Sequence, residues 1–236
     1  MLGGRAVLPP DGETDLVREF LGSAGGYFVD VGANDPQNGS QTWHLERAGW
    51  SGILIEPQPQ LAERLRKERH AEVVAVACSS PANSGKLMEL YCAGAMSSLE
   101  RGWTDSKSVV RVPVKSLNDV LAAARARSPI DFLSIDVEGH GLQVLQGTDL
   151  SRWRPRLILV EDHVMSLRLH RHLVANGYRW IRRTGLNSWY VPAPEATVSA
   201  FGRLQFLRKY YLALPFRHAR EALRWMRRSF TTLYST

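Results

Sequence analysis

The sequence is poor in cysteine and has no long apolar run. Only two cysteines, Cys78 and Cys92, occur in 236 residues. This number excludes a scaffold held together by several disulfides, and the separation of the two residues matches no known metal-ligand spacing. No apolar stretch approaches the roughly 18–20 residues that a membrane-spanning helix needs, and the opening residues MLGGRAVLPPDGETD lack a signal-peptide core. With 44% hydrophobic and 22% charged residues, we expect a cytoplasmic globular protein with two reduced thiols.

Acidic residues are nearly absent from the C-terminal segment. Residues 201–236 hold eight lysines and arginines but a single acid, Glu221, whereas residues 1–200 carry 22 basic and 22 acidic side chains. The segment therefore supplies the whole net charge of +7. We predict a domain over 1–200 and a basic helical tail over 201–236.

The tail also has the apolar spacing of a helix. Apolar residues recur at 201, 204, 207, 211 and 214, and again after Pro215 at 216, 219, 223, 226 and 230. In the second run Arg217, Arg220, Arg224 and Arg227 each follow an apolar position, which is typical of a helix lying at a membrane interface. The expected partner is either the anionic surface of a membrane, on the inner face of that membrane, or a polyanionic glycan. Packing on the body, or formation of a homodimer, is the alternative.

The rest of the chain alternates between strand-like and helix-like segments. Apolar strands are expected at 27–34, 52–57, 72–78, 130–136 and 156–162, and helices at 40–49, 60–69, 116–126, 142–147 and 165–177. Segments 178–183 and 187–191 are expected to pair at the edge. Apolar strands alternating with helices predict an α/β fold with a mostly parallel sheet covered on both faces.

One segment interrupts this alternation. Residues 79–113 contain two strand-like stretches, KLMELYC and VVRVPVK, around a loop rich in glycine and serine, AGAMSSLERGWTDSKS. We interpret 79–113 as an insertion or lid beside the site. Its Met96, Trp103 and Ser97-Ser98 are expected to influence the choice of substrate.

Four of the five core strands end on an acid. These are Asp30, Glu56, Asp136 and the pair Glu161-Asp162. Because ligands of parallel α/β sheets bind at the carboxyl ends of the strands, the pattern predicts a polar cleft there.

The turn after the first strand, VDVGANDPQNGS, lacks the G-x-G-x-x-G spacing of dinucleotide-binding proteins. It carries Gly32 and two carboxylates, Asp30 and Asp35, which suit a cationic ligand better than a pyrophosphate. Glu56 is placed to accept hydrogen bonds from ribose hydroxyls. These features favour S-adenosylmethionine over NAD.

Residues of about 25–163 carry several specific motifs. These are FVDVGANDPQNGSQTWHLERAGWSGILIEPQPQLAERLRKER, followed by SLNDVL, IDFLSIDVEGHGLQVLQG and RPRLILVED. Together and in this order they resemble the FkbM-type methyltransferase family. The most specific parts of the resemblance are the D-V-G-A-N-D turn with the I-E-P strand end, and the I-D-V-E-G-H block. The resemblance implies a class I (Rossmann-like) fold and S-adenosylmethionine-dependent O-methylation, largely of hydroxyls of sugars, glycolipids and polyketide-type metabolites.

The family pattern also implies site residues. Asp30, Gly32 and Asn34 would line the methionine part of the cofactor, Glu56 would bind the ribose, and the turn at Cys78-Ser79 would flank the adenine. Two positions depart from the family pattern. Gly141 stands where a glutamate is frequent, and Pro36 where a glycine is common.

Methyl transfer to a hydroxyl requires alignment of the acceptor and a group that takes its proton. If the chain stays extended after the fourth strand, Asp136, Glu138 and His140 share one face. His140 is the expected general base because its ordinary pKa is near neutrality, with a neighbouring carboxylate orienting the ring. Asp136, at the strand end, is expected in both the catalytic and the cofactor-binding set.

A metal-assisted reaction is an alternative. Asp136, Glu161 and Asp162 bring oxygen ligands from two strand ends, and this set would suit Mg²⁺ polarising the hydroxyl. His163 is close in sequence but is a less favourable Mg²⁺ ligand.

Two other functions remain open. The basic tail with its Trp and Tyr side chains would suit a nucleic-acid methyltransferase, although the neutral body and the lack of a recognisable RNA- or DNA-binding module make nucleic acid an unexpected partner. A protein that keeps the fold but has lost catalysis is the third possibility. The sequence does not specify the acceptor hydroxyl.

Overall fold

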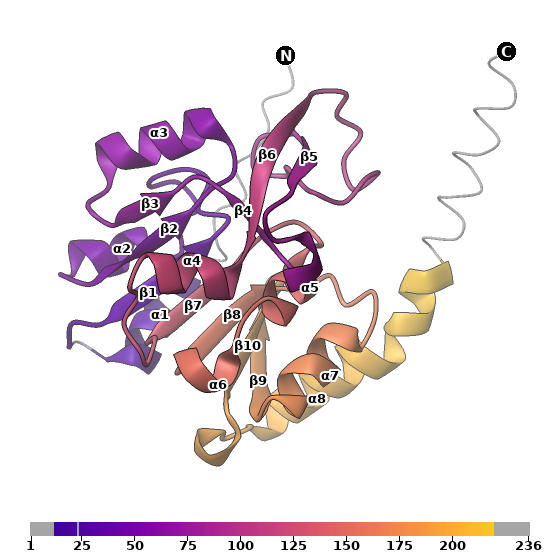
Figure 1. Ribbon diagram of the computed structural model, residues 1–236. Coiled ribbons are helices and arrows are strands. Elements are labelled where there is room, and N and C mark those ends of the chain that lie inside the picture. The colour runs from indigo at the N-terminus through magenta and orange to yellow at the C-terminus, as the bar shows by residue number, and fades with distance from the viewer. Residues whose placement is uncertain (1–11, 23, 220–236) are drawn as a thin grey trace, which may run out of the picture.

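The computed structural model describes residues 12–22 and 24–219. It contains a seven-stranded sheet of order β3-β2-β1-β7-β8-β10-β9 (Figure 1). The strands are β1 (Tyr27–Val31), β2 (Ser51–Ile55), β3 (Glu72–Val74), β7 (Phe132–Ile135), β8 (Leu157–Glu161), β9 (Tyr178–Thr184) and β10 (Asn187–Pro192). The first five of this order are parallel, whereas β10 is antiparallel to both β8 and β9. The predicted α/β fold and the edge pairing of 178–183 with 187–191 are confirmed.

Helices cover both faces of this sheet. One buried cluster joins β-strand residues to α1 (Glu13–Leu21), α2 (Trp43–Arg47) and α3 (Pro59–Glu68). The other cluster joins the opposite face to α4 (Leu117–Ala123), α5 (Gly141–Gln146), α6 (Leu150–Trp153) and α7 (Arg168–Ala175). The sheet is therefore buried on both sides, which explains why its strands are apolar throughout rather than alternating.

Three strands form a second, smaller sheet of order β4-β6-β5. Its strands are β4 (Ala77–Ser79), β5 (Leu87–Tyr91) and β6 (Val109–Ser116). The two strands expected within 79–113 are therefore present, and Figure 1 shows β5, β6 and their connection rising above the main sheet. The connection, residues 92–108, is called the lid segment below.

The expected third strand, 72–78, divides between the two sheets. Residues 72–74 pair with β2 in the large sheet, whereas Ala77–Ser79 pair with β6 in the small one. The chain bends between them, where Val76 N donates to Val74 O at 3.1 Å. This division places Cys78 and Ser79 beside the ends of the parallel strands.

The predicted tail begins by packing on the body. Helix α8 (Ala200–Phe206) continues into a π-helical segment, η3 (Leu207–Leu212), and residues 214–219 are also helical. Tyr210 is fully buried, and its hydroxyl donates to Asp162 Oδ2 at 2.8 Å. Gln205 exchanges two hydrogen bonds with the backbone of Arg183 in β9, at 3.0 and 2.8 Å.

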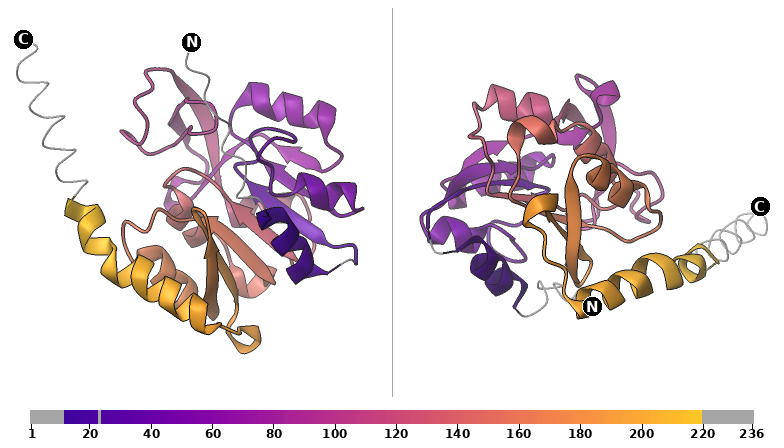
Figure 2. Two further views of the ribbon diagram at one scale, coloured as in Figure 1. Left: turned by 180° about the vertical axis from the view of Figure 1, so that it is seen from behind. Right: turned by 90° about the horizontal axis from the view of Figure 1, so that it is seen from below.

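Residues 200–219, the orange to yellow helical segment, lie along the outside of the molecule (Figure 2). Residues 220–236, which include most of the second amphipathic run, lie outside the described residues. The domain boundary at residue 200 stays a prediction. Within 12–22 and 24–219, no helix has the length and apolarity needed to cross a membrane.

Candidate active site

Two glycine-containing turns meet at the carboxyl ends of β1 and β7. Gly32 has φ of +87°, and a Cβ added there would lie 1.8 Å from the carbonyl oxygen of Asp136. Gly32 N and Ala33 N donate to Ile55 O at 2.9 and 3.1 Å, while Asp136 N donates to Val31 O at 2.9 Å. Only glycine allows this contact, which brings the predicted cofactor turn against the predicted catalytic loop.

A first cavity opens where these turns meet and encloses about 520 Å³, including its open mouth. Its wall includes five of the residues predicted for the site: Gly32, Asn34, Glu56, Asp136 and His140. No lysine or arginine is among the described residues that line it. The cavity is thus suited to a ligand that is neutral or cationic in its centre. We call it the cofactor cavity.

Glu56 is held rigidly at one end of this cavity. Its Oε2 accepts from Asn34 N at 3.0 Å and its Oε1 from Gln58 N at 2.8 Å. The side chain is buried, and burial raises the pKa of Glu56. Because each carboxylate oxygen can accept a second hydrogen bond, Glu56 can still bind two hydroxyls of a ligand.

Asp30 lies behind the cavity rather than on its wall. The residue is 3% exposed and its Oδ2 accepts from Thr42 Oγ1 at 2.7 Å. Burial raises the pKa of Asp30, opposed by Thr42 and by the nearby Arg69. In this geometry Asp30 anchors the turn, and its contact with the cofactor stays a prediction.

His140 connects the catalytic loop to two other segments. Its Nε2 lies 2.8 Å from Ser79 Oγ and its Nδ1 lies 2.7 Å from Glu100 Oε1 in the lid segment. Ser79 itself is fully buried and stands behind the cavity wall. Both nitrogens of His140 therefore have partners, which fixes the ring between the two segments; its role as general base stays a prediction.

A second cavity adjoins the same loop and encloses about 1,030 Å³, including its mouth. Gly139 and Gly141 of the loop, Trp103 of the lid segment, and Glu161 and His163 after β8 all line it. A Cβ at Gly139 would lie 2.7 Å from the Trp103 ring, so the indole packs directly on the loop backbone. Loop 136–141 thus separates this cavity, which we call the acceptor cavity, from the cofactor cavity.

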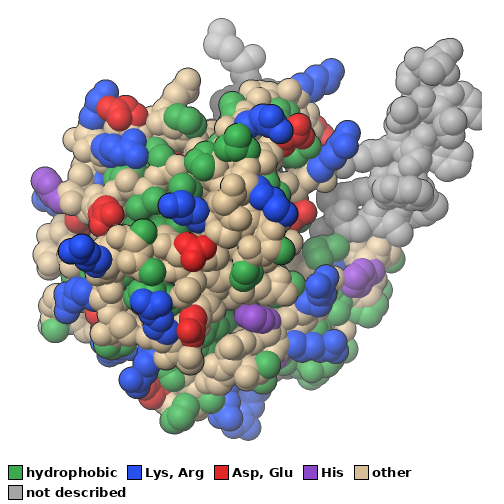
Figure 3. Space-filling model, viewed as in Figure 1, with side chains coloured by type: hydrophobic (Ala, Val, Ile, Leu, Met, Phe, Trp, Pro, Cys, Tyr) green, Lys and Arg blue, Asp and Glu red, His purple; other side chains and the backbone are tan. Residues whose placement is uncertain are grey.

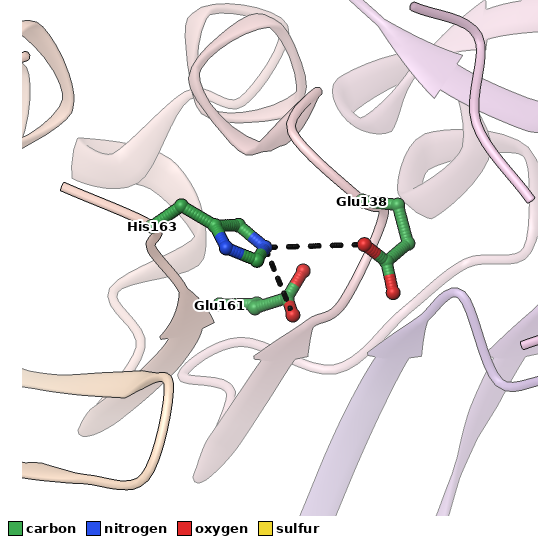
Figure 4. Close-up of side chains that lie close together, drawn as sticks. All are labelled: Glu138, Glu161 and His163. Atoms are coloured by element: carbon green, nitrogen blue, oxygen red, sulfur yellow. Dashed lines mark ion pairs between the residues drawn. The ribbon is translucent and has the colours of Figure 1, made fainter. Parts of the chain in front are cut away.

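Glu138, Glu161 and His163 converge between the loop and the end of β8 (Figure 4). His163 Nε2 lies 3.2 Å from Glu161 Oε1 and 3.9 Å from Glu138 Oε2. Trp103 Nε1 donates to Glu138 Oε2 at 2.8 Å. The carboxylate of Glu161 beside the ring raises the pKa of His163, and burial together with Glu161 raises the pKa of Glu138.

Asp136 lines the cofactor cavity, at the start of the loop that separates it from the acceptor cavity. The residue as a whole is exposed there, although protein atoms surround its carboxyl group. Burial, Glu161 and Glu138, in that order, hold the pKa of Asp136 well above its usual range. A carboxylate with a raised pKa is a better proton acceptor near neutrality than an ordinary aspartate.

The oxygen set predicted for Mg²⁺ is not assembled. Asp162 points away from Asp136: its Oδ1 accepts from Val164 N at 2.7 Å and its Oδ2 from Tyr210 at 2.8 Å. Successive residues of an extended strand end face opposite sides, so Glu161 faces the cavities and Asp162 faces the tail. Glu138 and His163 take the places expected for Asp136 and Asp162 beside Glu161.

The roles of His163 and Glu100 were missed by sequence reasoning. His163 follows the strand-end acids directly, and that adjacency was the only local signal. Glu100 reaches His140 from the lid segment, 40 positions earlier in the chain. No spacing rule predicts such a contact.

Three solved structures with a similar fold are distant from this chain in sequence. An FkbM methyltransferase from Methylobacillus flagellatus KT aligns with a TM-score of 0.45 and 14% identity, covering 71% of this chain and 43% of that one. Monomeric WbdD aligns with a TM-score of 0.48 and 14% identity, covering 80% and 43%. The N-terminal domain of human METTL16, in complex with SAH, aligns with a TM-score of 0.43 and 13% identity, covering 81% and 73%. The chain therefore spans less than half the length of the first two, and no curated protein sequence matches it.

The main sheet is parallel apart from its antiparallel edge pair, and the two cavities lie at the ends of its parallel strands. The methyltransferase FkbM domain family matches residues 30–180, which is more than half of the chain. This protein belongs to that family.

Proposed function

We propose that the chain is an S-adenosylmethionine-dependent O-methyltransferase whose acceptor is a hydroxyl of a sugar, glycolipid, polysaccharide or related metabolite. The observation that supports it is the position of loop 136–141 between two cavities. One cavity contains the Glu56 carboxylate, which suits the hydroxyls of a ribose, and the other contains the Trp103 indole and polar side chains. The family supports methyl transfer, and the acceptor is the new part of the proposal.

The cofactor cavity fits S-adenosylmethionine. Glu56 is positioned to accept from both ribose hydroxyls, and Val76 and Cys78 give an apolar wall for the adenine. The carboxylate of Asp136 and the absence of described cationic residues on the wall favour a sulfonium. When bound, the cofactor supplies an electrophilic methyl group, which passes from sulfur to the acceptor oxygen.

The acceptor cavity fits a polyhydroxylated ring. Trp103 offers an aromatic surface, and Gln143, Ser166 and Arg168 offer hydrogen-bonding groups on the same wall. The hydroxyl proton goes to Asp136, which lines the cofactor cavity and interacts with Glu161 on the wall of the acceptor cavity. The hydrogen bond from Trp103 orients Glu138. His140 holds in place the loop that carries Asp136, Glu138 and His140 itself.

Binding is tested by calorimetric titration of S-adenosylmethionine into the full chain. Glu56→Gln is expected to weaken binding about 10- to 100-fold, because one charged acceptor of the ribose is lost. Glu63→Gln on the exposed face of α3 is the matched control. Equal affinity of wild type and Glu56→Gln contradicts the assigned cavity.

Turnover is tested with radiolabelled methyl donor on sugar, glycolipid and RNA acceptors. Asp136→Asn is expected to lower kcat at least about 100-fold, in the range of general-base catalysis. Methylation of RNA but of no hydroxylated glycan or lipid would replace this proposal with a nucleic-acid methyltransferase. Tight cofactor binding without turnover on any acceptor would indicate a binding protein.

A further inference from the structure

The cluster of Glu138, Glu161 and His163 has unused binding capacity. The Glu161 side chain is only 8% exposed, and its buried Oε2 has no hydrogen-bond partner. His163 Nε2 is also buried and makes no hydrogen bond of good geometry, although it faces two carboxylates. Buried polar atoms without partners are costly, so the cluster is built to receive a further group.

The distances from His163 to the two carboxylates match those between ligands of one metal ion. The three ligand atoms lie within 4.8 Å of one another. Two ligands of one divalent ion, each bound at about 2.1 Å, are separated by at most about 4.2 Å. The 3.2 and 3.9 Å from His163 Nε2 to the two carboxylates satisfy that limit. Trp103 also orients Glu138 through its Nε1, as outer hydrogen bonds commonly orient metal ligands.

We propose that Glu138, Glu161 and His163 bind one divalent transition-metal ion, with Mn²⁺ as the probe, at the boundary of the acceptor cavity. A mixed carboxylate and imidazole set suits Mn²⁺, Fe²⁺ or Zn²⁺ better than Mg²⁺, which prefers oxygen ligands. Three protein ligands leave coordination positions open for the acceptor. Binding of the metal does not depend on the proposed function, but its role in the reaction does. There the metal would lower the pKa of the acceptor hydroxyl before Asp136 takes its proton.

Mn²⁺ binding to the metal-stripped full chain, followed by electron paramagnetic resonance, tests the site without any methyl transfer. The wild type is expected to bind one equivalent, and Glu161→Gln and His163→Ala are each expected to weaken binding at least about tenfold. Glu63→Gln and His70→Ala, at exposed positions, are the matched controls. Absence of stoichiometric binding, or equal binding by Glu161→Gln, overturns the metal site.

Activity separates this inference from the proposed function. Methyl transfer that persists in excess EDTA, with the metal removed, overturns the role of the metal in the reaction and leaves the methyltransferase proposal standing. One-to-one Mn²⁺ binding by a chain that methylates no acceptor supports the metal site and contradicts the proposed function.

A separate surface is formed by the start of the tail. The face of α8, η3 and residues 214–219 that points away from the body exposes six large apolar side chains, which we call the tail surface. Its members are Phe201 (74% exposed), Leu204 (62%), Leu207 (49%), Tyr211 (54%), Leu212 (60%) and Phe216 (77%). The opposite face packs on the body through Gly202 and Tyr210.

Charge identifies what covers this surface. Arg203 and Arg208 are exposed on the same helical segment, and residues 201–236 carry eight basic side chains against one acid. Figure 3 shows hydrophobic and basic side chains together at the lower right, where this segment lies, whereas the rest of the visible face has interspersed charges of both signs. We infer that the tail surface docks on an anionic lipid bilayer, with the apolar side chains at the acyl boundary and the arginines at the headgroups.

Flotation of the full chain with lipid vesicles tests this docking. The wild type is expected to float with phosphatidylglycerol-containing vesicles and about tenfold less with pure phosphatidylcholine. Phe201→Ser with Leu204→Ser is expected to reduce binding about tenfold or more, whereas Leu87→Ser, an equally exposed position on β5, is the matched control. Light scattering that shows a stable dimer, or binding to a soluble polyanion without flotation, overturns the lipid assignment.

Discussion

The imidazole of His140 and the carboxylate of Glu100 are joined at 2.7 Å, Nδ1 to Oε1, across 40 positions of sequence. Gln143 Nε2 donates to the same Glu100 oxygen at 2.9 Å. Through these contacts the lid segment is fastened to the loop that separates the two cavities. The order of the catalytic loop therefore depends on the lid segment.

This relationship predicts how a substitution of His140 acts. His140→Ala should weaken S-adenosylmethionine binding about 10- to 100-fold, because Ser79 and Glu100 lose a buried partner and the cavity wall loosens. The fall in kcat/KM toward low pH should remain, because we assign proton acceptance to Asp136 and not to His140. Affinity by calorimetry and the pH dependence of kcat/KM are the measurements. An unchanged affinity with loss of that fall would instead identify His140 as the general base.

The strands and the cleft were predictable from sequence because both depend on local pattern. Apolar runs ending in Glu56, Asp136 and Glu161 necessarily bring those acids to one edge of a parallel sheet. Side-chain direction was less predictable. Asp162 and His163 follow Glu161 along the chain, yet only a bend after β8 turns His163 back toward Glu138, while Asp162 binds the buried Tyr210.

The two cysteines should differ in reactivity. Burial raises the pKa of the Cys78 thiol to about 12, whereas Cys92 is partly exposed and its pKa is raised less strongly. An aromatic disulfide reagent at pH 8 should modify Cys92 in the folded protein and Cys78 only after unfolding. Cys92→Ala should therefore remove the thiol that reacts in the native state, and Cys78→Ala should retain it. Rapid reaction of Cys92→Ala would contradict the burial of Cys78.

His44 should make the protein less stable in mild acid. Burial, then Arg18, lower the pKa of His44 to about 4, and both ring nitrogens are buried without partners. Below pH 6.5 the unfolded chain binds a proton that the folded protein does not, so the free energy of unfolding falls as the pH drops from about 6.5 to about 4. In urea titrations at a series of pH values, His44→Gln should lose less stability across this window. Parallel curves for the two proteins would show that His44 titrates normally.

Gly32 should tolerate no side chain because a Cβ would clash with the Asp136 carbonyl oxygen, in addition to the strain of its positive φ. Gly32 and Gly39 both have positive φ, +87° and +74°, but a Cβ at Gly32 would lie 1.8 Å from Asp136 O, whereas one at Gly39 would meet nothing within 4 Å. Gly39→Ala should therefore cost only the left-handed backbone penalty of about 1–2 kcal/mol. Gly32→Ala should cost at least about 3 kcal/mol more, because the turns after β1 and β7 must separate. Urea unfolding measures both, and similar losses for the two variants would show that these turns do not meet as closely as the strands require.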